Sequence, residues 1–297
     1  MGAVPSEYLS PNLEDASKSE VVEGRASRRG RGRRWIAAGL AAAVIAIGAF
    51  VMVQAGGGSG GPLNAIARAA EVTQHEPGGS AVVHATVTVA NSPEGITEDG
   101  SMVFDDGGRS RGTFSFRGDS TGKEGTAEVI VDGETTYTSS DLFEGTLPEG
   151  KKWMKVDYGA AKPTFSSPVS ADAGPEEGLK VLEDVIGAEE VGEEDVRGVP
   201  TTHYAGILPR TEEVFGEKVQ FSAPHIDVWI DAQERVRRME VVIVGSVSED
   251  EPRATVKMSI DYLDFGQIPK IEPPDPDEVF DATGKYEAEI KSAAEGD

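Results

Sequence analysis

The chain has 297 residues, with 28 Lys or Arg and 52 Asp or Glu, so its formal charge is −24. The absence of cysteine excludes disulfide bonds, cysteine-ligated metal centres, thiol nucleophiles and a lipid anchor on a cysteine. The excess of acid argues against nucleic acid as a partner, because phosphate binding requires clustered Lys and Arg. It is interpreted as keeping the protein soluble and repelling it from an anionic membrane surface, with a specific cationic partner as the alternative.

Residues 1–34 differ from the rest of the chain in charge and composition. They hold seven Lys or Arg and five acids, so the negative excess belongs entirely to the remainder. The segment is rich in Ser, Gly, Arg and Glu and has no hydrophobic periodicity, which predicts a disordered tail.

An uncharged apolar run follows at Trp35–Ala55. As a helix rising about 1.5 Å per residue, it would span a hydrocarbon layer of about 30 Å. Six arginines precede it between residues 25 and 34, so the positive-inside rule places the N-terminus in the cytoplasm and residues 56–297 outside. We interpret the run as an uncleaved signal-anchor in the cell membrane. The alternatives are a cleaved signal peptide, with Val53-Gln54-Ala55 as the cleavage site, and a buried helix.

The remaining chain is expected to form one extracytoplasmic domain over residues 62–283. A Gly/Ser linker at 56–61 precedes it, and a polar tail at 284–297 follows it. The domain opens with a short amphipathic helix over Pro62–Val72, whose apolar residues have helical spacing and whose proline suits the first turn.

Most of this domain alternates apolar and polar residues with a period of two, which is typical of antiparallel strands with one apolar face. The alternation is clearest at 83–89, 113–117, 226–231 and 255–262. Further strands are expected at Ser101–Phe104, Ala127–Val131, Thr135–Thr138, Trp153–Val156, Thr201–Ile207 and Arg235–Val244. We therefore predict an α+β fold with about ten antiparallel strands and a few segregated helices.

One further helix is predicted over Glu176–Gly187, with Leu179, Leu182 and Ile186 on its apolar face and Gly187 ending it. The connector before it, Ala160–Gly174, is rich in Pro, Ser and Ala and contains one large apolar residue, Phe165. It is interpreted either as a mobile gate or as a solvated linker.

The sequence contains no recognisable catalytic or metal-binding motif. The histidines at positions 75, 84, 203 and 225 do not have the spacing of paired metal ligands. No nucleophile elbow, P-loop or dinucleotide fingerprint is present. Acids are so frequent that no pair of them singles itself out, so we expect neither an enzyme nor a bound metal or cofactor.

A series of short motifs in this order resembles the actinobacterial LppX/LprG-like lipoproteins within the LolA superfamily. The resemblance begins with the opening helix and the two-faced strand at 80–89. It continues through Val131–Gly133, Tyr137, Trp153–Val156, Gly178–Ile186, Val196–Tyr204, Val228–Asp231, Val236–Arg238, Tyr262–Gly266, Ile271–Pro274 and Asp277–Val279.

This resemblance implies a strongly curved antiparallel sheet, an open half-barrel, with helices capping an apolar cavity that holds lipid or an acylated lipoprotein. The apolar residues expected to line the cavity are Val87, Phe114, Phe116, Ile226, Val228, Ile230, Met258 and Ile260 on strands, Leu179, Leu182 and Ile186 on the helix, and Phe165 in the connector. The alternative for the strand residues is a closed core.

The chain departs from those lipoproteins in its anchor, because a transmembrane segment replaces the acylated cysteine. Two functions follow as hypotheses. The first is a membrane-tethered lipid- or lipoprotein-binding module that aids amphiphile transport across the envelope. The alternative is an envelope sensor that signals through its cytoplasmic tail. The sequence leaves the ligand and the oligomeric state open.

Overall fold

The computed structural model describes residues 61–90, 95–118, 124–143, 147–157, 179, 181–209, 213–214, 217–218, 220–246 and 253–285. The expected tail, signal-anchor and most of the linker lie outside these residues, as do the connector with Phe165 and nearly all of the polar C-terminal tail. In the part that is described, none of the helices is both long and apolar enough to cross a membrane.

The described residues form mostly β-structure. The α-helix α2 spans Pro62–Gln74, and three 3-10 turns are η3 (Asp141–Phe143), η4 (Val181–Asp184) and η5 (Pro276–Glu278). The long strands are β1 (Gly78–Val89), β2 (Gly95–Asp105), β3 (Arg109–Gly118), β4 (Glu124–Asp132), β5 (Thr135–Ser140), β6 (Trp153–Asp157), β7 (Ile186–Val196), β8 (Val199–Ile207), β12 (His225–Asp231), β13 (Val236–Ser246) and β14 (Ala254–Leu263). The short ones are β9 (Glu213–Val214), β10 (Glu217–Lys218), β11 (Gln220–Phe221) and β15 (Val279–Asp281).

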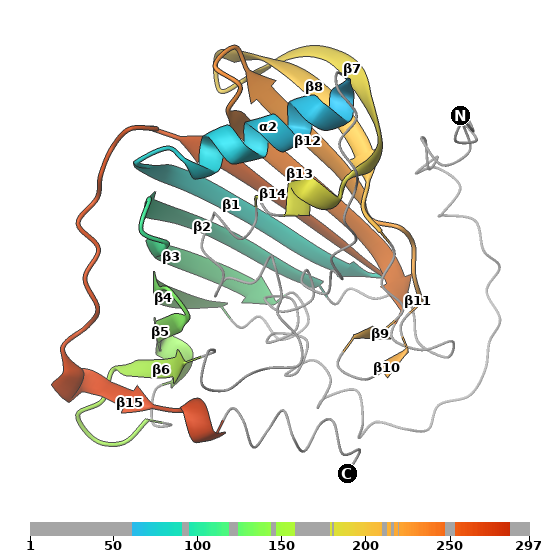
Figure 1. The fold of residues 1–297 in the computed structure, drawn as a ribbon. Helices are drawn as coiled ribbons and strands as arrows, with labels where there is room; N and C mark the ends of the chain where they lie inside the picture. Colours follow the sequence, from blue (N-terminus) through green and yellow to red (C-terminus); the bar gives the residue numbers. More distant parts are fainter. Residues whose placement is uncertain are drawn as a thin grey trace, which may run out of the picture. The chain divides into compact units, whose positions relative to one another are not determined.

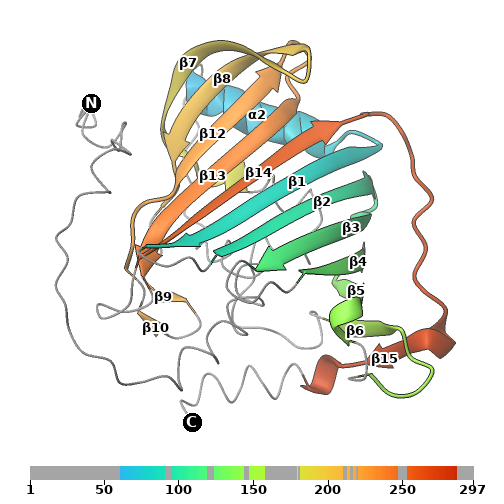
Figure 2. The same ribbon diagram turned by 180° about the vertical axis from the view of Figure 1, so that it is seen from behind.

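Thirteen strands form one sheet in the order β15-β6-β5-β4-β3-β2-β1-β14-β13-β12-β8-β7, with β11 pairing β13 beside this path. Figure 1 shows α2 lying across one face of this sheet, near β12 and β13. Seen from behind in Figure 2, the sheet twists strongly between its β7 and β6 ends. All neighbouring long strands are antiparallel as predicted, whereas β15 adds to β6 in parallel, so the sheet is mixed.

All the strands expected from alternation are present, and several are longer than predicted. The strand expected at 101–104, for example, begins at Gly95, and the one expected at 127–131 spans Glu124–Asp132. The edge strand β7 was not predicted, because five of the eleven residues in IGAEEVGEEDV are acidic and the strand has no run of alternating apolar residues.

The helix predicted over Glu176–Gly187 is wrong in its second half. Residues 181–184 form the 3-10 turn η4, and Ile186 already begins β7. The buried side chains of this segment include Val181, Leu182 and Val185, whereas Ile186, expected on the apolar face, is exposed. Packing of η4 against α2 therefore overrides the local helical pattern.

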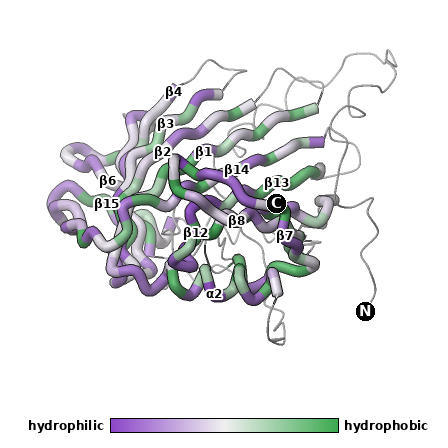
Figure 3. The backbone as a smooth tube through the Cα atoms, turned by 90° about the horizontal axis from the view of Figure 1, so that it is seen from above, coloured by the Kyte–Doolittle hydropathy of each residue, from purple (hydrophilic) through white to green (hydrophobic). Residues whose placement is uncertain are grey.

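Strand register separates the sheet into two faces of opposite character. Directly paired residues lie on the same face, so the pairs Val83–Ile260 and Ala85–Met258 belong together. We call this apolar side, on which α2 packs, the inner face, and the opposite side the outer face. The outer face carries charged pairs such as Lys257–Glu240. Figure 3 shows the resulting alternation of hydrophobic and hydrophilic residues along the strands.

The helix α2 is fixed to the inner face by apolar contacts and one buried hydroxyl. Ile66, Ala69 and Ala70 are almost completely buried. Thr73 donates its hydroxyl to the carbonyl of Ala69 (2.6 Å) and accepts the backbone N–H of Val236 (2.8 Å). The start of β13 thus satisfies its first backbone donor through the helix rather than through a neighbouring strand.

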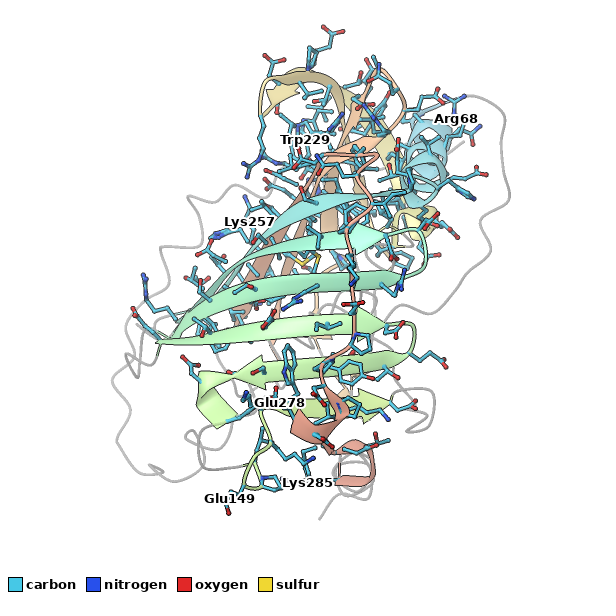
Figure 4. The ribbon with its side chains drawn as sticks, turned by 90° about the vertical axis from the view of Figure 1, so that its left-hand side faces the viewer. Arg68, Glu149, Trp229, Lys257, Glu278 and Lys285 are labelled. Atoms are coloured by element: carbon cyan, nitrogen blue, oxygen red, sulfur yellow. The ribbon has the colours of Figure 1, made fainter. Side chains whose placement is uncertain are left out.

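A C-terminal segment closes the β6 end of the sheet. After β14 the chain runs past the strand ends and returns as β15 beside β6 (Figure 1). Ile271 and Val279 of this segment pack with Ile130 and Trp153 in a second, smaller core. In Figure 4, Glu278 marks this end of the sheet and Trp229 marks the other.

Two hairpins are closed by the same Asp–Arg arrangement. Asp105 accepts the backbone N–H of Arg109 (3.1 Å) and its guanidinium (2.9 Å), and Asp231 accepts the same two groups of Arg235 (3.0 Å each). Both carboxylate side chains are 1% exposed. Burial opposes ionisation of Asp231, but its hydrogen bonds to Arg235 and Arg237 outweigh burial and hold its pKa below the usual value.

On the inner face, aromatic rings lie flat over glycines. Gly100 pairs with Phe114, and a Cβ added at Gly100 would overlap the Phe114 ring. A Cβ at Gly112 would approach the other edge of this ring at 2.9 Å. The absence of side chains at both glycines therefore lets Phe114 lie buried against β2 and β3.

We expect Gly100→Ala to lower the free energy of unfolding by about 1–3 kcal/mol, because the methyl group must displace the Phe114 ring. Gly284→Ala is the matched control, since a Cβ there meets no atom within 4 Å. Urea denaturation of both variants measures the effect. Equal stability of the two variants would show that Phe114 does not require the glycine.

The outer face of β8, β12 and β13 carries an ordered stack of side chains. The rings of His203 and Trp229 are parallel, with centroids 4.3 Å apart, and Arg238 lies 5.8 Å from the Trp229 centroid. Trp229 donates its indole N–H to Glu194 of β7 (2.9 Å). This stack ties the acidic edge strand to the centre of the sheet.

Two histidines beside this stack share one carboxylate. Asp227 Oδ1 lies 2.7 Å from His203 Nε2, and Asp227 Oδ2 lies 3.0 Å from His225 Nε2. The hydrogen bond to Asp227 raises the pKa of His225. Burial opposes ionisation of Asp227, but hydrogen bonds from both histidines outweigh it and lower the pKa of this carboxyl.

These shifts predict that acidification strengthens the fold within a limited range. Folding raises the pKa of His225, so protonation of this residue stabilises the folded state. This stabilisation is complete below about pH 6.5 and is lost as pH rises through the pKa of His225 in the folded protein. Because the pKa of Asp227 is lowered, its contribution is lost only below about pH 4. The difference in unfolding free energy between the wild type and His225→Gln should therefore grow as pH falls from about 8 to 6.

His84→Gln is the control, because His84 pairs with Asp99 at an exposed position. Chemical denaturation at several pH values measures both variants. A difference for His225→Gln that stays constant over this range would contradict the proposed linkage.

Candidate functional site

Described elements cover one part of the inner face and leave another part without a described cover; we call these the covered and the uncovered part. The covered part lies under α2 and η4, where Ile226, Val228 and Met239 are 0% exposed. Leu179 and Leu182 pack into the same core and are 2% exposed. These side chains are closed off from solvent.

The uncovered part lies on β1, β3 and β14. It is toward the strand ends that lie opposite to the Asp–Arg hairpins. Val83, Ala85 and Val87 of β1 are half-buried. Val83 and Ala85 also pack directly against the main core. Val256 of β14 and Phe116 of β3 are half-buried as well. Because Val87 pairs with Val256 on one side and with Ile96 on the other, these three side chains form a continuous apolar row across β14, β1 and β2. Glu98 of β2 lies between Ala85 and Phe116.

The structure divides the residues predicted to line a cavity between these two parts. Phe114, Ile226, Val228, Ile230, Met258 and Ile260 are buried in the main core, together with Leu179 and Leu182. Val87 and Phe116 belong to the uncovered part. Ile186, expected on a helix beside Leu179 and Leu182, lies instead on the edge strand β7 and is 43% exposed. Phe165 lies outside the described residues.

Two polar groups on the inner face were not singled out from the sequence. Glu98 is 8% exposed and pairs with Ala85 and Phe116. Its position was missed because the residues from Gly95 to Gly100 are too polar to suggest a strand. Tyr204 of β8 is half-buried, and burial raises the pKa of its hydroxyl, so this group stays protonated at neutral pH.

A hollow of about 310 Å³ lies between β2, β3 and β4 near Asp141. Its lining consists of Thr97, Asp99, Ser115, Phe116, Arg117, Glu124, Gly125, Thr126 and Asp141 and includes three carboxylates. In the described part of the chain, no three ligating side chains are arranged to hold a metal ion.

Comparison with known proteins yields distant similarities. No family model matches the chain. A Streptomyces griseus protein, described as an uncharacterized 31.2 kDa protein in the rplA-rplJ intergenic region, is 24% identical over 239 residues, covering 69% of this chain and 76% of that protein.

Among solved structures, the Mycobacterium tuberculosis lipoprotein LppX is similar with a TM-score of 0.42 and 13% identity, covering 71% of this chain and 97% of LppX. LprF from Mycobacterium bovis is similar with a TM-score of 0.37 and 16% identity, covering 73% of this chain and 99% of LprF. A LolA superfamily protein from Nitrosomonas europaea is similar with a TM-score of 0.29 and 7% identity, covering 73% of this chain and 96% of that protein. These are the kinds of protein that the sequence motifs resemble.

The two parts of the inner face should respond differently to added volume. We expect Val228→Phe to lower the unfolding free energy by about 1–3 kcal/mol through overpacking. Val87→Phe should change it by less than about 1 kcal/mol, because its side chain is not enclosed. Thermal and urea denaturation measure both. Equal, large losses would mean that the surface around Val87 is a closed core.

Proposed function

We propose that this protein is a membrane-tethered, extracytoplasmic module that binds an acyl chain of a lipid or lipoprotein on the uncovered part of its inner face. The observation that carries this proposal is the half-buried apolar surface of Val83, Ala85, Val87 and Val256, with Phe116 on the far side of Glu98. Each methylene group that such a surface removes from water contributes about 0.8 kcal/mol, so a long acyl chain could bind without any specific polar contact.

The fold supports this proposal because the sheet supplies far more apolar area than the described helices cover. Of the described helices, α2 has its main contacts with β7, β12, β13 and the short turn η4. Catalytic groups are not needed for binding of this kind, since shape and apolar area suffice. We therefore do not assign an enzymatic reaction.

The proposed tether is the apolar segment Trp35–Ala55, with residues 1–34 in the cytoplasm and the domain from residue 62 outside. Its support is the length of the run and the arginines before it. A tethered domain would receive and release amphiphiles close to one membrane, as part of transport across the envelope.

The cytoplasmic segment of 34 residues favours a second candidate, an envelope sensor whose ligand-bound state is reported inward. Deletion of this segment distinguishes the two. A carrier should keep its transport phenotype in a deletion strain with the apolar run intact, whereas a sensor should lose its signalling.

A photoactivatable lipid tests the binding surface. The full-length protein is reconstituted in phospholipid vesicles that contain a lipid with a diazirine in its acyl chain, and crosslinked peptides are identified by mass spectrometry. We expect crosslinks on β1 and β14. We also expect Val87→Trp to reduce them about tenfold or more, because the indole would occupy the surface.

Thr88→Trp is the matched control, since Thr88 is the neighbouring residue of β1, is exposed and lies on the outer face. This variant should crosslink like the wild type. Absence of inner-face crosslinks in the wild type, or equal loss in both variants, would refute acyl-chain binding at this surface.

A further inference from the structure

The hollow of about 310 Å³ near Asp141 opens on the outer face of β2, β3 and β4. Six of its lining residues form two rows across these strands, one of Thr97, Arg117 and Glu124 and one of Asp99, Ser115 and Thr126. Ser115 directly follows the inner-face residue Phe114 on β3, and paired residues share a face, so both rows lie on the outer face. Three adjacent strands therefore bring polar side chains together at this place.

The hollow arises because short side chains lie among longer ones. Ser115 and Thr126 end in hydroxyl groups close to the backbone. The side chains of Arg117 and Glu124 in the next row are longer. Asp141 of η3 accepts the backbone N–H of Thr126 (2.9 Å) and its hydroxyl (3.4 Å). These two bonds hold a carboxylate at the side of the hollow where β5 ends.

The lining offers both donors and acceptors of hydrogen bonds, and solvent reaches them. Arg117 donates its Nε to Glu124 (2.8 Å), and the two side chains are 66% and 69% exposed. A guanidinium carries about five N–H donors and a carboxylate accepts about four hydrogen bonds, so this one bond leaves most of their capacity to a ligand. Asp99 Oδ1 lies 2.7 Å from His84 Nδ1, and the side chain of Asp99 is also exposed.

The composition of the lining favours one class of ligand. Three carboxylates and one guanidinium give the hollow a formal charge of −2, which opposes phosphates, sulfates and carboxylates. The hydroxyl groups of a sugar both donate and accept, so one sugar ring can use the guanidinium and the carboxylates together. The volume suits a single small ligand, since pockets for such molecules measure roughly 300–1,000 Å³.

We propose that this hollow binds the ring of a neutral sugar. Arg117 donates hydrogen bonds to the oxygen atoms of the sugar, and Asp99 and Glu124 accept hydrogen bonds from its hydroxyl groups. Phe116, which also lines the hollow, adds apolar surface for the C–H groups of the ring. This inference goes beyond the proposed function and does not depend on acyl-chain binding.

Saturation-transfer NMR on the full-length protein in phospholipid nanodiscs tests the site at about pH 7, where uronates are ionised. The probes are D-glucose, D-galactose and D-mannose, the uronate of each, which has the same ring with a carboxylate, and choline as a small organic cation. We expect at least one neutral sugar to bind with a dissociation constant in the millimolar range, because a few hydrogen bonds at an exposed site provide little more. Its uronate should bind about tenfold more weakly.

Ser115→Trp tests the location, because the indole would fill the space between the two rows. Thr113→Trp is the matched control, since Thr113 is exposed, lies on the same face of β3 and is not part of the lining. The first variant should weaken sugar binding about tenfold, whereas the second should stay within about twofold of the wild type. Arg117→Gln, a change at an exposed side chain, should weaken it about fivefold. Urea denaturation shows whether each variant is folded.

Three results would overturn the proposal: no binding of any neutral sugar to the wild type, equal binding of a sugar and its uronate, or unchanged binding in folded Ser115→Trp. Binding of choline alone would refute it as well and assign the hollow to organic cations. Val87→Trp changes the inner face only and should bind the sugar like the wild type. Failure of acyl-chain binding and failure of sugar binding are therefore observed separately.

Discussion

The structure depends on one constraint, which is that a large sheet of alternating strands must cover one apolar face with very few helices. Pairing of neighbouring strands places Val83, Ile260 and Met239 side by side. In the described residues α2 is the only long helix, and it packs near β7, β12 and β13. The inner face therefore combines a closed core, which includes buried side chains under α2 and on β2, β3 and β4, with half-buried aliphatic side chains such as Val87 and Val256.

The edges of the sheet are protected in two different ways. At one end, β7 exposes Glu189, Glu190 and Glu193, and charged side chains of this kind oppose pairing with another chain. At the other end, β15 covers β6, with Lys152 paired to Glu278 and Lys155 paired to Asp281 (3.2 Å). The acidic composition noted in the sequence thus has a local role at β7 as well as a general effect on solubility.

The strands could be predicted from sequence because burial on one face imposes a period of two, which is local information. The segment 255–262, for example, alternates throughout and forms β14. The strand β7 could not be predicted, because its stability comes from pairing with β8 and from the contact of Glu194 with Trp229, neither of which leaves an apolar pattern. A similar reason explains why the helix predicted over Glu176–Gly187 is wrong in its second half, since packing against α2 decides the conformation there.

The candidate site was accessible from sequence only in part. Alternation correctly identified which residues of β1, β3, β12 and β14 share a face, but it could not show which of them α2 covers. Val228 and Val87 have the same pattern around them, yet one is 0% exposed and the other half-buried. That difference depends on where α2, which precedes Val228 by roughly 150 residues, packs on the sheet. Such a long-range contact leaves no local pattern in the sequence. Glu98 was missed because polar residues surround it in sequence, whereas apolar residues surround it across the strands.

The division of the inner face also separates stability from the proposed binding. The strand β14 contributes Tyr262, which is 0% exposed, to the closed core and Val256 to the uncovered surface. Its ten-residue register with β1 holds both ends of the strand in one ladder. The closed core therefore stabilises the strands, and the side chains of the uncovered surface are already positioned before any acyl chain binds. An acyl chain that binds there as proposed would gain apolar burial without the entropic cost of ordering the backbone, because folding has ordered it beforehand.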